Sequence, residues 1–301
     1  MKISEFQFNI GNLELLARQV VEGFIIGLHK SPFHGFSVEF AEHRLYNPGD
    51  NLKYVDWKVF GKRDKMFVKK FEEETNLKCC IAIDTSSSMW LSKQDGVSKM
   101  QFSCLAAAAL MQLLRKQLDA TGLCLFSDKV HFQSLVKSSE RHYKTLISEM
   151  EKLLIHPPEH KATNLPAVLH QLAETLPKRS FLIVFSDFLD DPEREEEFYT
   201  ALQHLKFMKQ EVIVFQVGDG KQEWDFEFEN RPYQFVDLET GEKLKLNPKE
   251  VRPYFLEAVN AYNKRLEAHC LQYNIDLTKV DIQLDIYKIL ENYLIKRNKL
   301  M

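Results

Sequence analysis

The chain has 301 residues, of which 45% are hydrophobic and 28% charged, a composition typical of folded globular proteins and not of disordered ones. A formal net charge of -3 argues against a global basic field that would recruit nucleic acid. No apolar stretch reaches the ~20 residues that cross a bilayer, so we expect no membrane insertion. The five cysteines lack C-x-x-C spacing, which favours reduced core thiols and a cytoplasmic protein.

The first 78 residues change from helical to strand-like patterning. Residues 12–28 begin with an N-cap candidate and repeat apolar side chains at helical spacing, which predicts a first helix. From residue 35 to residue 45 apolar side chains recur at alternate positions, and short strands or bends are expected near residues 55–57 and 67–68. We therefore predict a helix followed by a β-rich segment over residues 1–78.

From residue 79 onward, buried strands alternate with helices, which is the pattern of βαβ units. This predicts an α/β fold over residues 79–222, with a Rossmann-like open, mainly parallel sheet flanked by helices. The expected strands are 79–83, 122–126, 129–136, 181–185 and 212–217, and the expected helices are 97–120, 140–155, 165–176 and 193–207.

The last part of the chain, residues 223–301, is expected to pack on the other two. Two strand-like runs at 233–238 and 243–246 flank a turn, which predicts a β-hairpin. A helix at 250–270, a short strand at 275–277 and a terminal helix at 285–295 are expected to follow.

Five oxygen-bearing side chains are expected at one edge of the sheet. Residues 84–88 follow a buried strand and offer a carboxylate and two hydroxyls at alternate positions. A threonine before the helix at 165–176 and an acid after the strand at 181–185 can complete the set, because ligands bind beyond the carboxyl ends of strands in open α/β sheets. The predicted ligands are Asp84, Ser86, Ser88, Thr163 and Asp187, which suit Mg²⁺, with Mn²⁺ or Ca²⁺ as alternatives. Taken singly, each side chain could instead cap a helix or form a turn.

These motifs carry a family resemblance. Residues 79–220 resemble a von Willebrand factor A domain with its metal-ion-dependent adhesion site. The matching motifs are Asp84-Thr85-Ser86-Ser87-Ser88-Met89, Ala162-Thr163-Asn164-Leu165 and Ser186-Asp187.

The preceding segment resembles the signature of the DUF58 family, in which a β-rich segment precedes a von Willebrand A-like domain. The residues that carry this resemblance include Gly35, Glu39-Phe40, Arg44, Tyr46, Pro48-Gly49-Asp50, Asp56-Trp57-Lys58 and Arg63. Lys53 departs from the family, which usually has arginine there. We expect Arg44, Asp50, Asp56, Trp57 and Arg63 to form a structural network, with Trp57 in the core; contact with a partner is the alternative.

The resemblance implies a metal-dependent protein-binding adaptor or chaperone-like module. It would work with a MoxR-type AAA+ ATPase, or that ATPase's client, in assembling or activating a protein complex, and its cation would accept an acidic side chain from the partner. The alternative is a metal-dependent hydrolase or phosphotransferase that uses the same site. The sequence offers no recognisable general base or activated nucleophile beside the ligands, so we expect no enzymatic activity.

Overall fold

The computed structural model describes residues 11–30, 43–45, 67–69, 77–91, 96–157, 162–188, 194–236, 241–283 and 286–300. The chain divides into two compact units, Ile25–Asn76 and the remainder. In the smaller unit, β1 (His43–Leu45) pairs antiparallel with β2 (Phe67–Lys69). Arg44 lies on β1, whereas Asp50, Asp56, Trp57 and Arg63 lie outside the described residues, so the network predicted for them stays a prediction.

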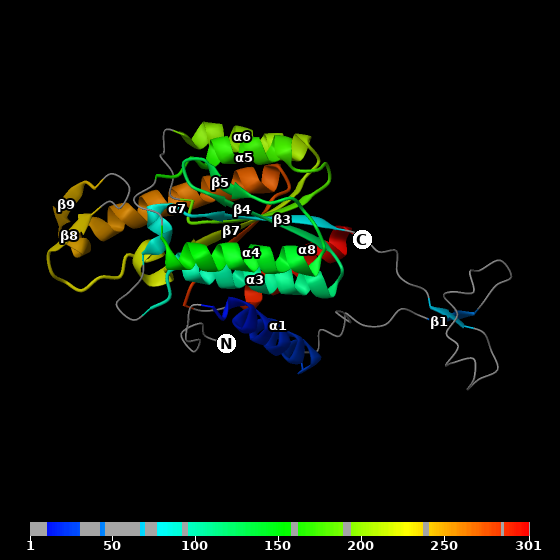
Figure 1. Ribbon diagram of the computed structural model, residues 1–301. Coiled ribbons are helices and arrows are strands. Elements are labelled where there is room, and N and C mark those ends of the chain that lie inside the picture. The colour runs from blue at the N-terminus through cyan, green and yellow to red at the C-terminus, as the bar shows by residue number, and fades with distance from the viewer. Residues whose placement is uncertain are drawn as a thin grey trace. The chain divides into compact units, whose positions relative to one another are not determined.

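A six-stranded sheet with the order β10-β7-β6-β3-β4-β5 forms the centre of the larger unit (Figure 1). Every neighbouring pair is parallel except β4 and β5, which are antiparallel. The predicted α/β class with an open, mainly parallel sheet is therefore confirmed. The strands are β3 (Lys78–Asp84), β4 (Ala120–Phe126), β5 (Val130–Gln133), β6 (Phe181–Ser186), β7 (Glu211–Gly218) and β10 (Asp276–Asp281).

Helices cover both faces of this sheet (Figure 1). One face packs on α5 (Leu165–Thr175), α6 (Glu195–Phe207) and α7 (Pro248–Gln272). The other side carries α3 (Lys99–Lys116), α4 (Glu140–Ile155) and α8 (Tyr287–Leu300), while α1 (Leu13–Lys30) begins the described chain. Cys80 and Ala82 of β3 belong to the core beneath α5 and α6, and the intervening Ile81 and Ile83 are equally buried. Burial on both faces explains why the central strands read as continuous apolar runs.

The predicted helix over 97–120 is shorter than expected at both ends. It begins after Ser98, whose side chain and that of Gln101 form a reciprocal capping box. It ends at Lys116 because Leu118 turns the chain with a φ of 60° and Ala120 already pairs in β4. The chain therefore needs residues 117–119 to reverse direction between helix and strand.

The C-terminal part contains the expected hairpin, β8 (Tyr233–Val236) and β9 (Lys243–Leu246). Two short elements were not predicted: the 3-10 helix η3 (Ser87–Trp90) and the π-helix η5 (Gly220–Trp224). Both follow strands of the central sheet, β3 and β7. Within the described part of the chain, no helix combines the length and the apolar character needed to cross a membrane.

Candidate metal centre

Asp84 is the last residue of β3, at the carboxyl end of a central strand, and it is fully buried. Its Oδ1 accepts a hydrogen bond from the backbone N–H of Ser86 at 2.9 Å. Its Oδ2 accepts one from the hydroxyl of Ser186 at 2.8 Å and a longer one from Thr163 at 3.4 Å. Both carboxylate oxygens are thus fixed by neighbours from three segments of the chain.

The two serines of the first motif lie side by side after this strand. The hydroxyls of Ser86 and Ser88 are 3.1 Å apart. Thr85 anchors the loop to the neighbouring strand β4, because its backbone N–H and its hydroxyl both donate to the Phe126 carbonyl, at 2.6 Å and 2.8 Å. Register between β3 and β4 therefore determines where the two serine hydroxyls lie.

Thr163 reaches the site from the start of α5. The next residue, Asn164, donates its backbone N–H to the Ser127 carbonyl at the end of β4 and caps α5 by accepting from the Ala167 N–H. Thr163 is 7% exposed and its hydroxyl points at Asp84. The cap and the strand contact together hold this hydroxyl in the site.

Asp187 follows β6, which lies next to β3 in the sheet. The following residue, Phe188, adopts a φ of 57°, a left-handed conformation that is costly for a large side chain. Its N–H donates to the Ser186 hydroxyl at 3.1 Å, and its carbonyl accepts from the Tyr262 hydroxyl at 2.8 Å. The strained backbone at Phe188 is held by Ser186 and by Tyr262, and it thereby positions the carboxylate of Asp187.

The pKa of Asp84 reflects its burial and the nearby carboxylate of Asp187. Burial is the main cause that raises its pKa to about 6, and the nearby charge of Asp187 raises it further. The Ser86 N–H and the Ser186 hydroxyl oppose this rise. The structure therefore brings together all five predicted ligands: four are joined by hydrogen bonds, and Asp187 acts on Asp84 through its charge.

Two residues that sequence reasoning missed complete the cluster. Lys99, the first residue of α3, is 1% exposed, and its Nζ lies 2.7 Å from Asp187 Oδ2 and 2.7 Å from Glu223 Oε1. Burial lowers the pKa of Lys99, but the two carboxylates outweigh burial and raise it overall. One signal in the sequence could have indicated this role. A lysine directly after an N-cap is unfavourable next to the positive end of the helix macrodipole, so its presence there suggests an acidic partner.

Glu223 is held by the π-helix η5. Its second oxygen, Oε2, accepts the N–H of Asp219 at 3.1 Å, and Asp219 caps η5 through the N–H groups of Lys221 and Gln222. A Cβ at Gly218 would lie 2.9 Å from Glu223 Oε2 and 2.9 Å from Trp224 Nε1, so a larger residue here would displace both side chains. π-Helical turns are rare and are frequently found at functional sites.

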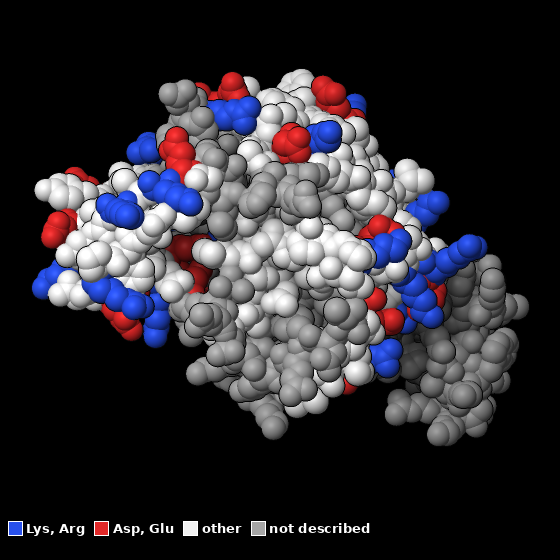
Figure 2. Space-filling view, turned by 60° about the vertical axis from the view of Figure 1, so that its left-hand side comes forward, with Lys and Arg blue, Asp and Glu red and all other residues white. Residues whose placement is uncertain are grey.

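The residues fit a divalent cation. Among the described residues, Asp84, Asp187 and Glu223 gather around one ammonium, that of Lys99, so acids outnumber cations in the described part of the site. Figure 2 shows acidic side chains in a hollow of one face of the molecule. Within the described ranges, no group of three or more His, Cys, Asp or Glu side chains could hold a metal, so serine and threonine hydroxyls would have to complete any ligand set here.

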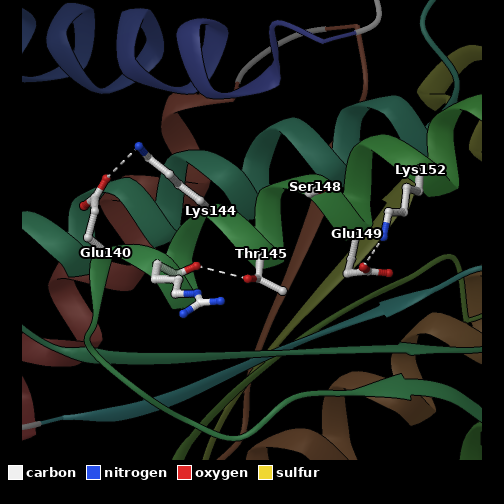
Figure 3. A pocket seen from close by; sticks show the side chains of 7 residues that line it. Glu140, Lys144, Thr145, Ser148, Glu149 and Lys152 are labelled. Atoms are coloured by element: carbon white, nitrogen blue, oxygen red, sulfur yellow. Dashed lines mark hydrogen bonds and ion pairs between the residues drawn. The ribbon is translucent and has the colours of Figure 1, made fainter.

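A separate cavity of about 610 Å³ lies along the exposed side of α4. Figure 3 shows its lining side chains spaced along one helix, where Lys152 and Glu149 pair at 2.6 Å and Lys144 and Glu140 at 3.9 Å. None of the five predicted ligands is among the described residues that line it. This cavity is therefore distinct from the candidate metal centre.

Residues 42–265 match the model of a family described as "Protein of unknown function DUF58". The chain belongs to the DUF58 family. The resemblance to the DUF58 family is thereby confirmed over most of the chain.

Curated relatives include Uncharacterized protein Rv1480 of Mycobacterium tuberculosis and Uncharacterized protein Mb1516 of Mycobacterium bovis. Each is 23% identical over 177 residues, which cover 59% of this chain and 55% of the relative. The chain thus spans about half the length of the curated relatives that it matches.

Similar solved structures include the conserved hypothetical protein BatB from Bacteroides thetaiotaomicron, with a TM-score of 0.47 and 16% identity over 74% of this chain and 99% of that one. An aerotolerance-related membrane protein from Bacteroides fragilis has a TM-score of 0.47 and 17% identity over the same shares. The SpRpn10 VWA domain has a TM-score of 0.41 and 12% identity over 71% of this chain and 93% of that one.

Proposed function

We propose that this member of the DUF58 family is a protein-binding module that works through a divalent cation, Mg²⁺ in the first place. The cation would be held by Asp84, Ser86, Ser88, Thr163 and Asp187. When bound, the cation supplies a Lewis-acidic position that an acidic side chain of a partner protein can occupy.

The observation that carries this proposal is the gathering of buried carboxylates at one edge of the sheet. Asp84 and Asp187 are 0% and 3% exposed, and the ammonium of Lys99 contacts Asp187 and Glu223. Gathering acids away from water is costly, and a divalent cation would reduce the repulsion between them. The raised pKa of Asp84 has the same physical origin.

The hydrolase or phosphotransferase alternative is less well supported. A serine and a histidine do meet near the site, because the hydroxyl of Ser127, at the end of β4, contacts Nε2 of His131. Asp128 approaches that same nitrogen at 3.4 Å, whereas a catalytic triad uses the opposite ring nitrogen for its acid. Ser127 is also fully buried. We therefore propose that the module is not an enzyme.

For the partner, we propose a MoxR-type AAA+ ATPase or a client of that ATPase. This rests on the family membership and on the ligand set, whose oxygen donors leave an ion able to accept one further carboxylate. The pairing would place the chain in the assembly or activation of a protein complex.

The test is capture of the candidate ATPase by the immobilised full chain, with Mg²⁺ and after chelation with EDTA. Recovery should fall severalfold on chelation and in the isosteric variant Asp84→Asn, which removes one ligand charge. Asp225→Ala, an exposed acid after η5, is the matched control and should leave recovery unchanged. Recovery that ignores both EDTA and Asp84→Asn would refute a cation-dependent contact.

A further inference from the structure

Two histidines meet between the helices α5 and α6, which lie side by side on one face of the sheet (Figure 1). Nδ1 of His170, in the middle of α5, is 2.9 Å from Nδ1 of His204, in the last turn of α6. The ring centroids are 5.2 Å apart and the rings are tilted by 44°. A hydrogen bond between these nitrogens needs a proton on one and a lone pair on the other, so two potential metal-binding atoms point at each other.

The packing of the two helices fixes the positions from which these rings project. Leu169 and Leu205, the neighbours of the two histidines in sequence, are 1% and 0% exposed and belong to the same hydrophobic core. His170 and His204 are themselves half-buried, at the border of this core. The fold therefore holds the two imidazoles together while leaving the pair within reach of solvent.

The pair has the chemistry and nearly the geometry of a transition-metal site. Imidazole nitrogen suits Zn²⁺, Ni²⁺ and Cu²⁺, whereas Mg²⁺ and Ca²⁺ prefer oxygen. Two Zn–N bonds of about 2.0–2.1 Å at a tetrahedral angle place their nitrogens about 3.3 Å apart. The two Nδ1 atoms, now 2.9 Å apart, need to separate by only about 0.4 Å to reach that distance. The position of His204 at the carboxyl end of α6 also favours a positive charge there.

We propose that His170 and His204 form a second metal site, which binds Zn²⁺ or a similar transition metal through the two Nδ1 atoms and bridges α5 to α6. The metal takes the place of the proton between the two nitrogens, and that proton is released to solvent. In the part of the chain that the structure describes, no third His, Cys, Asp or Glu side chain completes a metal-binding group, so water fills the remaining positions.

This site is independent of the proposed function. The two histidines lie within α5 and α6, whereas the candidate ligands Thr163 and Asp187 precede these helices. The nitrogen ligands also select a different class of metal from the oxygen ligands at the edge of the sheet. Each site can therefore be tested without the other.

The test is isothermal titration calorimetry of Zn²⁺, Ni²⁺ and Cu²⁺ into the untagged full chain, with Mg²⁺ in excess to occupy oxygen sites. We expect Cu²⁺ to bind most tightly of the three, as imidazole sites generally favour it. His170→Asn and His204→Asn should each weaken Zn²⁺ binding at least about tenfold, because one imidazole ligand is lost while the amide can still form a hydrogen bond.

His156→Asn is the matched control, because His156 is exposed at the end of α4, and it should leave Zn²⁺ affinity unchanged. Repeating the titration in Asp84→Asn separates the two sites, since a loss of Zn²⁺ binding there would place the metal at the edge of the sheet and overturn the inference. Wild-type Zn²⁺ affinity in both His170→Asn and His204→Asn would overturn it as well. Zn²⁺ binding that needs both histidines, in a chain that takes up no Mg²⁺, would support this site and refute only the proposed function.

Should the asparagine variants fail to fold by circular dichroism, nuclear magnetic resonance of the ¹⁵N-labelled wild type makes the same test. Of the ten histidines in the chain, two should shift their Nδ1 signals when Zn²⁺ is added. Imidazole signals that all stay in place at saturating Zn²⁺ would overturn the inference.

Discussion

Asp119 illustrates at the scale of one residue how burial governs a charge in this protein. It follows α3, is 1% exposed, and accepts the N–H of Leu77 at 3.2 Å while its Oδ2 lies 3.0 Å from Arg297. Burial raises the pKa of Asp119 to about 6, and Arg297 and the Leu77 N–H only partly oppose it. The folded protein therefore holds this proton more tightly than the unfolded chain does.

The sign of the resulting pH dependence is fixed. Because the folded pKa of about 6 lies above the ordinary value of 3.8 for an aspartate, the protonated form contributes stability below pH 4, and that stability is lost as pH rises to 6. In the wild type, this loss lowers the unfolding free energy by at most about 3 kcal/mol between pH 4 and pH 7. Asp119→Asn cannot ionise, so the unfolding free energy of the variant should fall by that much less over the same range. Urea unfolding at the two pH values measures it. Identical pH slopes in wild type and variant would contradict the prediction.

Single residues also show where sequence reasoning stops. The meeting of the five candidate ligands could be predicted because each sits in a local motif at the end of a predicted strand or start of a helix. Lys99 and Glu223 could not, because they are 124 positions apart and meet only through the packing of α3 and η5 near Asp187. The charge of Lys99 at a helix start was the one local sign.

At the scale of elements, the first turn of α3 positions Lys99 in the candidate site. The capping box joins Ser98 Oγ to the Gln101 N–H at 3.1 Å and Gln101 Oε1 to the Ser98 N–H at 3.0 Å. Lys99 lies between these two residues. Fraying of this turn would release the ammonium from Asp187.

Ser98→Ala should therefore have two effects. Loss of the cap should lower the unfolding free energy by about 1 kcal/mol, and release of Lys99 should change Mg²⁺ affinity severalfold. Ser139→Ala removes the N-cap of α4, which accepts from the His142 N–H at 3.3 Å, and is the matched control. It should cost similar stability but leave Mg²⁺ binding unchanged. Denaturant unfolding and calorimetry measure the two effects, and equal Mg²⁺ affinity in both variants would contradict the link.

The elements themselves differed in how well they could be predicted. The strands β3, β6 and β7 are long apolar runs buried on both sides, and the structure places each within two residues of its predicted bounds. The π-helix η5 could not be predicted, because its form depends on the contact of Glu223 with Lys99 and on the lack of side chains at Gly218 and Gly220. The periodicity of apolar residues indicates which face of an element is buried, but it does not indicate which other elements that face contacts.

At the scale of the larger unit, the terminal helix α8 closes one side of the sheet. Tyr293 is fully buried, and its ring meets the ring of Phe181, in β6, edge-on with centroids 5.7 Å apart. Two cations of the same helix are paired at its end: Lys296 with Asp276 at 2.7 Å, and Arg297 with Asp119. Helix α8 is therefore part of the core of this unit.

Tyr293→Ala should lower the unfolding free energy by roughly 3–5 kcal/mol, because a large aromatic side chain leaves a cavity between α8 and the sheet. Tyr254→Ala on α7, where the ring is 75% exposed, should change it by less than about 0.5 kcal/mol. Chemical denaturation of the full chain measures both. A cost for Tyr293→Ala as small as that for Tyr254→Ala would show that α8 docks loosely.

The ligands of the candidate centre come from strand and loop segments that stand far apart along the chain, from Asp84 through Thr163 to Asp187. An incompletely synthesised or partly unfolded chain cannot assemble them, since the parallel neighbours β3 and β6 must first pair. An ion that binds only the assembled form would stabilise it by mass action. A partner that recognises the bound ion would then distinguish folded molecules from incompletely folded ones.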